Sequence, residues 1–381
     1  MKAALLTLFA AAVLGAQPPH PRLLLVSVDG LDQRYLARCD ELGLRIPALR
    51  RLMAEGAWAD GVVGEIPTIT WPMHTTILTG VPPAVHGIQR NRVWDYSSIK
   101  VKTLWDDLRA KGRASAAITW PVTVGAPITW NLPENFVRRQ GGSMDLESVA
   151  AKATPGLVQE IASRYPSFPQ QWVDDRTRTL AAIYLLQQKH PDLLAVHLVD
   201  LDAEEHETRP FSQASKATLE HIDELIGRML QAMPPETTLA LVSDHGFEAV
   251  EKTVYLPVGH ATPFLVTAAN AEEAEQLERL GHDPANGIGR RIPAAEWKRF
   301  LPGTPEPAAA YEPAGLFLFS PVPTEGRYGK PREAGTHGLW PGRSGYRSVF
   351  LVWGPGIRPA RLPEMPMLDI YPRLKALLAV E

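Results

Sequence analysis

A short apolar run, Leu23 to Val28, stops abruptly at Asp29 and Gly30. Such runs are typical of a strand that is buried on both faces of a sheet, because a half-buried strand would alternate apolar and polar residues. Three later segments follow the same plan and end at acidic or glycine-rich turns: residues 193–199, 239–243 and 348–352. We therefore expect at least four buried strands in one sheet.

Helical patterns lie between these strands. Residues 175–189 and 218–233 carry apolar side chains at helical spacing, and residues 367–380 are expected to form a closing helix. Strands that alternate with helices predict an α/β fold, in which a mostly parallel central sheet carries helices on both faces.

Composition excludes several classes of protein. The 381 residues include 45% hydrophobic and 21% charged residues, which is ordinary for a globular chain and unlike a disordered or coiled-coil one. The formal net charge of −3 and the lack of a long basic run give no indication of nucleic-acid duplex binding. A single cysteine, Cys39, excludes an internal disulfide and a cysteine-based zinc site.

The N-terminus resembles a targeting segment. Lys2 precedes an apolar run from Ala3 to Ala16, and a polar, proline-containing stretch begins at Gln17. Residues 1–16 are therefore predicted to be a signal peptide, which makes the mature protein exported, periplasmic or extracellular, without a transmembrane span. Residues 22–381 are predicted to form the catalytic domain, and the irregular stretch 251–333 is expected to be a small inserted subdomain.

Acidic residues follow three of the predicted strands: Asp29, Asp202 and Asp244. Ligands of an open α/β sheet bind beyond the carboxyl ends of its strands, so these positions are candidates for a functional site. Taken singly, each acid is more simply interpreted as a turn former or a helix cap.

Nearby histidines favour a metal site over isolated caps. His206 follows Asp202 by four residues, which places both side chains on one face of a helical turn, and His245 is adjacent to Asp244. His337 lies between glycines in Gly335-Thr-His-Gly338. A cluster of carboxylates and imidazoles suits divalent metals, zinc first.

Thr70 is the candidate nucleophile. Pro72 is well placed in the first turn of a helix that is expected to end at Gly80, so Thr70 lies at the helix N-terminus, where free N–H groups favour an anion. A threonine hydroxyl becomes a good nucleophile only when a base or metal lowers its pKa. The alternative interpretation is that Thr70 or Thr68 simply caps this helix.

Six stretches in this order resemble the type I phosphodiesterase/nucleotide pyrophosphatase family of the alkaline phosphatase superfamily. They are residues 26–30, 67–74 with Thr79 and Gly80, 86–88 with Asn91, 202–206, 243–246 and 335–338. The resemblance spans essentially the whole mature chain and implies an alkaline-phosphatase-like fold. It also implies hydrolysis of phosphodiester or pyrophosphate bonds through a phosphothreonine intermediate, with a small-molecule phosphodiester or nucleotide as substrate.

The resemblance further implies two zinc ions. One would be bound by Asp202, His206 and His337. The other would be bound by Asp29, Asp244, His245 and the oxygen of Thr70.

Substrate contacts are implied in the same way. Asn91 matches the asparagine that holds a non-bridging phosphate oxygen, and Trp71 matches the aromatic residue that packs against a nucleobase. The second aromatic residue of a base sandwich has no motif, and the candidates are Tyr165, Phe168 and Trp172, of which Phe168 is preferred.

Two departures from the family pattern leave substrate preference open. Met73 stands where the family usually has Asn, and Leu31-Asp32 replaces the common Phe-Arg pair. The alternatives are a phosphomonoesterase or phosphonate hydrolase on the same two-metal site, or an exported protein that binds metal or phosphate without turnover. A sulfatase is disfavoured because Cys39 lies away from the nucleophile turn.

Overall fold

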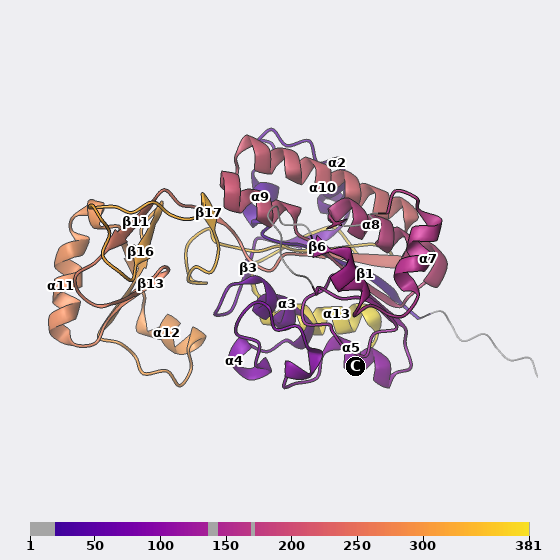
Figure 1. The fold of residues 1–381 in the computed structure, drawn as a ribbon, viewed down its shortest axis with the longest axis horizontal. Coiled ribbons are helices and arrows are strands. Elements are labelled where there is room, and N and C mark those ends of the chain that lie inside the picture. Colours follow the sequence, from indigo (N-terminus) through magenta and orange to yellow (C-terminus); the bar gives the residue numbers. More distant parts are fainter. Residues whose placement is uncertain (1–19, 136–143, 169–171, 381) are drawn as a thin grey trace, which may run out of the picture.

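A central eight-stranded sheet organises the main lobe of the protein (Figure 1). The computed structural model describes residues 20–135, 144–168 and 172–380. The strands, in spatial order, are β19 (Ala360–Leu362), β2 (Ala57–Ala59), β18 (Phe350–Trp353), β9 (Thr237–Val242), β1 (Arg22–Val28), β8 (Leu193–Leu198), β4 (Ser115–Ile118) and β5 (Trp130–Leu132). Strand β18 is antiparallel to both neighbours and the others share one direction, so the predicted mostly parallel sheet is confirmed.

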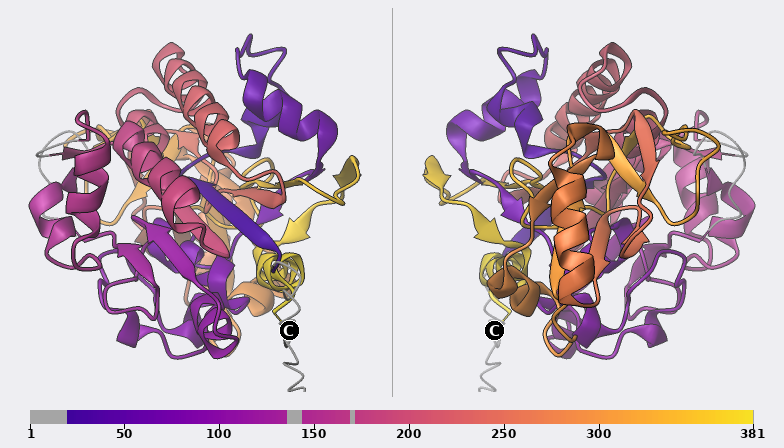
Figure 2. Two further views of the ribbon diagram at one scale, coloured as in Figure 1. Left: turned by 90° about the vertical axis from the view of Figure 1, so that its right-hand side faces the viewer. Right: turned by 90° about the vertical axis from the view of Figure 1, so that its left-hand side faces the viewer.

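Successive residues of β1 point into different cores. Leu24 and Val26 belong to one hydrophobic cluster, and Leu23 and Leu25 belong to another on the opposite face. The first face is covered by α2 (Pro47–Glu55), α8 (Asp175–Tyr184), α9 (Asp200–Thr208) and α10 (Gln213–Ala232). The second is covered by α3 (Thr70–Thr79), α5 (Leu104–Ala110) and α13 (Ile370–Leu378). Helices on both faces confirm the predicted α/β class (Figure 2).

The remaining helices and strands of the main lobe are short. They are α1 (Gln33–Ala37), β3 (Val62–Val63), α4 (Pro83–His86), β6 (Met144–Asp145), α6 (Leu146–Ala150), α7 (Leu157–Arg164), β7 (Trp172–Val173) and β20 (Met365–Pro366). The helix expected over residues 175–189 is α-helical only to Tyr184, and a π-helical segment, Leu185–Lys189, completes it.

A smaller lobe stands beside the main one (Figure 1). It consists of β11 (Lys252–Tyr255), β12 (His260–Thr262), β13 (Leu265–Ala268), α11 (Ala271–Gly281), β14 (Ile288–Arg291), α12 (Ala294–Phe300), β15 (Ala309–Pro313) and β16 (Phe317–Ser320). A separate hydrophobic cluster that includes Val266, Leu277 and Phe319 supports it. We propose that this lobe is the subdomain predicted over residues 251–333.

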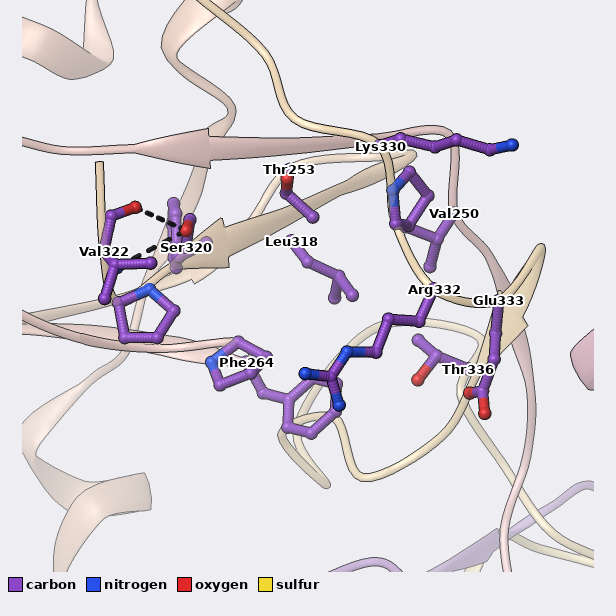
Figure 3. A pocket seen from close by; sticks show the side chains of 14 residues that line it. Val250, Thr253, Phe264, Leu318, Ser320, Val322, Lys330, Arg332, Glu333 and Thr336 are labelled. Atoms are coloured by element: carbon purple, nitrogen blue, oxygen red, sulfur yellow. Dashed lines mark hydrogen bonds between the residues drawn. The ribbon is translucent and has the colours of Figure 1, made fainter. Parts of the chain in front are cut away.

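A two-stranded ladder joins the lobes. Strand β10 (Glu248–Ala249) leaves the main lobe and pairs antiparallel with the returning β17 (Gly335–Thr336). This ladder brings residue 337 back beside the loop that follows β9. A pocket of about 490 Å³ lies near this junction (Figure 3).

The predicted signal peptide, residues 1–16, lies outside the described residues. Within the described part of the chain, no helix combines the length and the apolar character needed to cross a membrane.

A buried carboxylate from one helix caps another. The N-cap residue of α2, Ile46, offers no side-chain hydrogen bond to the first turn. Asp223 of α10 instead accepts hydrogen bonds from the backbone N–H groups of Ala48, at 3.0 Å, and Leu49, at 2.7 Å. These bonds tie α2 to α10 on one face of the sheet.

We expect Asp223→Ala to lower the free energy of unfolding by about 2 kcal/mol, because two N–H groups lose a charged acceptor. Urea denaturation measures this loss. Glu224→Ala is the matched control, since Glu224 is a neighbouring acid on the same helix whose side chain is 74% exposed. Equal stability of the two variants would contradict the capping role.

Candidate active site

Three neighbouring parallel strands bring the predicted acids together. Strand β1 lies between β8 and β9, so Asp29, Asp202 and Asp244 all follow the carboxyl ends of adjacent strands. Gly30, with a φ of +73°, turns the chain after β1 so that its N–H donates to Asp244 Oδ1 at 3.1 Å. An acid cluster therefore follows directly from the strand order.

One group of candidate ligands combines α9 with the returning chain. Asp202 and His206 lie one turn apart on α9, and His337 follows β17. The Nε2 atoms of His206 and His337 each lie 3.5 Å from Asp202 Oδ1. These three side chains can hold one metal ion between them.

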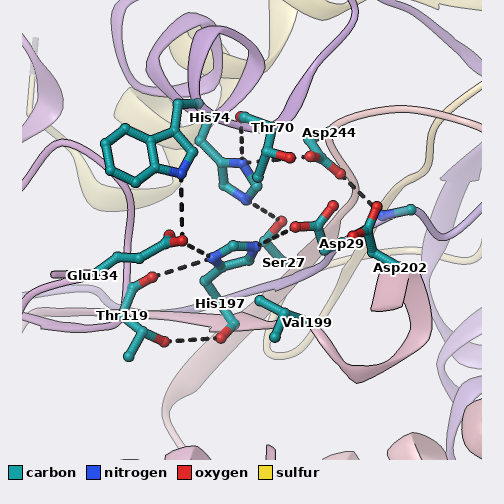
Figure 4. Close-up of polar contacts among 12 residues, drawn as sticks. Ser27, Asp29, Thr70, His74, Thr119, Glu134, His197, Val199, Asp202 and Asp244 are labelled. Atoms are coloured by element: carbon teal, nitrogen blue, oxygen red, sulfur yellow. Dashed lines mark hydrogen bonds and ion pairs between the residues drawn. The ribbon is translucent and has the colours of Figure 1, made fainter. Parts of the chain in front are cut away.

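A second group consists of Asp29, Asp244 and His245, and Figure 4 shows its two carboxylates. His245 Nε2 lies 3.4 Å from Asp29 Oδ1 and 3.1 Å from Asp244 Oδ2. Asp29, Asp202 and His245 also place one ligand atom each within 4.8 Å of one another. Asp202 therefore lies within reach of both groups of candidate ligands, whereas the family resemblance implied that it belongs to only one.

The three histidines have the tautomer that metal binding requires. The Nδ1 atoms of His206, His245 and His337 lie 3.1, 3.2 and 3.4 Å from the backbone oxygens of Gly335, Gly246 and Thr68, respectively. Because a carbonyl oxygen can only accept, each Nδ1 carries a hydrogen, so Nε2 is the ring atom that faces the carboxylates and is left to bind a metal. Glu333 reinforces this for His206 at 2.8 Å.

Several buried polar atoms in this cluster lack a hydrogen-bond partner among the described residues. They are Asp29 Oδ1, Asp202 Oδ1, Asp244 Oδ2 and His245 Nε2. Buried polar atoms are normally paired, so unpaired lone pairs that converge on one place fit a divalent cation. The residues present therefore fit the zinc ions implied by the resemblance.

Electrostatics support the same conclusion. Burial raises the pKa of Asp29 well above its usual value, and the neighbouring charges of Asp244 and Asp202 raise it further. Burial also opposes ionisation of Asp202, but His206 outweighs it and holds the Asp202 pKa below its usual value. Burial opposes protonation of His206, yet Asp202 raises the pKa of His206 to about 11. Protons thus occupy positions that a metal would take, and metal binding would release them.

Thr70 lies at the N-terminus of α3, beside Asp244 (Figure 4). His74 connects the two residues, since its Nδ1 is 2.7 Å from Thr70 O and 3.6 Å from Asp244 Oδ2. The Thr70 hydroxyl makes no hydrogen bond to another described residue, whereas Thr75 and Thr79 of the same helix donate to the carbonyls four residues earlier.

The capping interpretation of this segment is wrong. The N-cap of α3 is Ile69, which makes no side-chain cap hydrogen bond, and the Thr68 hydroxyl donates to Leu339 O at 2.7 Å. In this turn the Trp71 N–H donates to Asn91, Pro72 has no N–H, and the Met73 N–H donates to Ile69 O. Among the described residues, the Thr70 N–H has no partner and stands at the positive end of the helix dipole, which attracts an anion.

Asn91 adds a donor at this position. Its Oδ1 accepts a hydrogen bond from the Trp71 backbone N–H at 2.9 Å. Because the backbone N–H can only donate, the amide oxygen must face it, and Nδ2 is left to donate elsewhere. The predicted role of Asn91 on a phosphate oxygen stays a prediction, and this orientation is compatible with it.

The two predicted aromatic contacts occupy buried positions. Trp71 is 3% exposed, packs edge-on against Trp94 and donates through Nε1 to Glu134. Phe168 is 5% exposed and belongs to the main core cluster. Stacking on a base would require either ring to leave its packed position. Of the other candidates, Tyr165 packs on the same core, and the Trp172 side chain lies outside the described residues.

The sequence reasoning missed a supporting layer of polar residues. His197 Nε2 lies 3.0 Å from Asp29 Oδ2, and His197 Nδ1 lies 3.3 Å from Glu134 Oε2. Burial disfavours the charged form of His197, but hydrogen bonds to Asp29 and Glu134 outweigh it and raise its pKa to about 10. The signal was present, because His197 interrupts the apolar strand β8.

His74 has a structural role in this layer. Its Nε2 pairs with the Ser27 hydroxyl at 2.8 Å, and its Nδ1 faces Thr70 O. With both nitrogens engaged, His74 holds α3 against β1 and is not available as a ligand.

Fold and site together define a class of α/β protein that has a cluster of candidate metal ligands at its strand ends, beside an unpaired helix-terminal hydroxyl. The sequence model of the type I phosphodiesterase / nucleotide pyrophosphatase family matches residues 23–282. The chain belongs to that family.

Relatives and solved structures agree with this assignment. Ectonucleotide pyrophosphatase/phosphodiesterase family member 1 of Homo sapiens is 23% identical over 89% of this chain and 38% of its own length. Bis(5'-adenosyl)-triphosphatase ENPP4 of Bos taurus is 26% identical over 66% of this chain and 54% of its own length. The chain therefore spans less than two thirds of the length of these curated relatives. Human ectonucleotide pyrophosphatase/phosphodiesterase 5 shares the fold, with a TM-score of 0.64, 18% identity and coverage of 94% of this chain and 95% of that one.

We expect His197→Ala to weaken binding of at least one zinc ion about tenfold, because Asp29 loses the partner that orients it. Competition with a chromophoric chelator measures the affinity. His221→Ala, at a half-exposed position on α10, is the control. His197→Gln, which keeps an N–H donor, is expected to recover part of the loss. Unchanged affinity in His197→Ala would refute this supporting role.

Proposed function

We propose that this protein is an exported, two-zinc hydrolase that cleaves phosphodiester or pyrophosphate bonds through a phosphothreonine at Thr70. One observation carries the proposal. An unpaired threonine hydroxyl at a free helix N-terminus adjoins a buried cluster of carboxylates and imidazoles whose lone pairs lack partners. A purely structural site has no need for this combination.

The chemistry takes two displacements. Thr70 Oγ1 gives its proton to solvent and attacks phosphorus; the new O–P bond forms as the bond to the leaving group breaks, and the leaving group departs with the electron pair of that bond. Water then attacks the phosphothreonine, restores the threonine and releases the second product. When bound, the zinc ions supply charge that lowers the pKa of the nucleophile and stabilises the leaving oxygen.

The chain's own residues would position the phosphoryl group. Asp29, Asp244 and His245 would hold the zinc beside Thr70, and Asp202, His206 and His337 would hold the other. The Asn91 amide and the Thr70 N–H at the start of α3 would bind the non-bridging oxygens, where negative charge increases in the transition state.

Relatives support the substrate class and the location. Names among them include a bis(5'-adenosyl)-triphosphatase, venom phosphodiesterases and ectonucleotide pyrophosphatases. We propose a nucleotide or another small phosphodiester as substrate, and export from the cytoplasm directed by residues 1–16.

Thr70→Ala is expected to reduce turnover of bis-(p-nitrophenyl) phosphate by about 10³-fold or more, because alanine has no hydroxyl to form the covalent intermediate. The measurement is steady-state release of p-nitrophenol by the zinc-loaded enzyme. Thr79→Ala, in the last turn of the same helix, is the control for helix integrity. Normal turnover by Thr70→Ala would exclude Thr70 as the nucleophile.

The same assay separates the alternatives. A preference for bis-(p-nitrophenyl) phosphate over p-nitrophenyl phosphate supports the phosphodiesterase function. The opposite preference assigns the site to a phosphomonoesterase. Activity on neither compound, with zinc bound, points to a phosphonate hydrolase or a binding protein.

His337→Ala is expected to lower zinc content from two equivalents toward one, because one ligand group loses a member while the other remains intact. Elemental analysis after dialysis gives the content, and chelation of both ions is expected to abolish turnover. Two full equivalents in the variant would show that His337 is not a ligand.

A further inference from the structure

The pocket of about 490 Å³ near the β10–β17 ladder borders the candidate metal ligands on one side (Figure 3). Glu333 lines it and also lies 2.8 Å from His206 Nδ1. Thr336 lines it as well and directly precedes His337. A Cβ added to Gly338 would come within 2.9 Å of Phe264, so this lining residue packs against the backbone that follows His337.

The pocket lining combines an apolar wall with two cations. Phe264, Leu318 and Val322 contribute the apolar part, and the Val322 side chain is left 62% exposed. Lys330 and Arg332 contribute the charge, and no ion pair between either of them and an acid occurs in the described part of the chain. Figure 3 shows Arg332 extending into the pocket, whereas Lys330 points outward at its edge.

The position of the pocket indicates which half of the substrate it would contact, and this step rests on the proposed function. In an in-line displacement the leaving group departs on the side of phosphorus opposite Thr70. The ligand group that would stabilise the leaving oxygen is Asp202, His206 and His337. Glu333 and Thr336, which line the pocket, adjoin His206 and His337, so the pocket lies on the side of this ligand group.

We propose that this pocket binds the leaving half of the substrate, and that this half is an organic phosphate whose anionic group pairs with Arg332. An unpaired guanidinium favours a phosphate over a neutral alcohol. The apolar wall favours an organic phosphate that carries a ring over inorganic phosphate. The preferred bond is therefore a phosphoanhydride between two organic halves.

Equilibrium binding tests the assignment without turnover. In the zinc-loaded Thr70→Ala protein, calorimetry compares a dinucleoside polyphosphate with bis-(p-nitrophenyl) phosphate, whose leaving half carries no phosphate. Adding Arg332→Ala is expected to weaken binding of the dinucleotide about tenfold more than binding of the p-nitrophenyl diester, since one charged hydrogen bond is lost. Arg279→Ala, an exposed arginine on α11 of the same lobe, is the matched control and is expected to change neither affinity.

Equal effects of Arg332→Ala on the binding of these two compounds, or no effect, would overturn the assignment. If Arg332→Ala weakened the binding of inorganic pyrophosphate as much as that of the dinucleotide, the proposal that the leaving half is an organic phosphate would be overturned. With Thr70 intact, Arg332→Ala is expected to lower kcat/KM for the dinucleotide about tenfold relative to bis-(p-nitrophenyl) phosphate, again from one charged contact. Lack of turnover on any ester by the wild type would sink the proposed function, while the binding comparison would still decide the role of Arg332.

Discussion

Concentration of negative charge at one edge of the sheet is the constraint on which this structure depends. Strand β1 lies between β8 and β9, so the three acids that follow them meet in a buried place. Buried carboxylates are costly unless they are paired, and the raised pKa of Asp29 expresses that cost. Three histidines and a layer of hydrogen bonds surround the acids, and divalent metals would complete the compensation.

The smaller lobe is tied to this charge cluster by a short connection. The chain leaves the site after His245, forms the lobe, and returns through β17 to deliver His337. The chain segment that leaves and returns in this way thus leads to a candidate ligand, His337, and also supplies the residues that line the adjoining pocket. Under the proposed assignment of the pocket, changes in the lobe would alter which leaving group is accepted without disturbing the strand ends that would hold the phosphoryl group.

Much of the fold and cluster could be predicted because the signals are local. Apolar runs that end at acids mark buried parallel strands, and the spacing of Asp202 and His206 places both on one helical face. The position of Thr70 at a helix N-terminus likewise follows from Pro72 and Gly80 nearby. Such patterns depend on backbone periodicity, which the sequence shows directly.

Features that depend on long-range packing were not predicted. The pairing of His197 with Asp29 joins residues 168 positions apart, and the ladder that returns His337 joins segments on either side of the smaller lobe. Burial of Trp71 depends on Trp94 and Glu134, whose proximity no local pattern indicates. Side-chain exposure is a property of the assembled fold. The sequence therefore identified Trp71 beside the nucleophile but could not show that its ring is buried.

The most direct test of the account is anomalous X-ray diffraction at the zinc edge from crystals of the zinc-loaded protein. The account predicts two peaks, one among Asp29, Asp244 and His245 and the other among Asp202, His206 and His337. A single peak, or a peak away from these side chains, would contradict the two-metal site and the mechanism built on it.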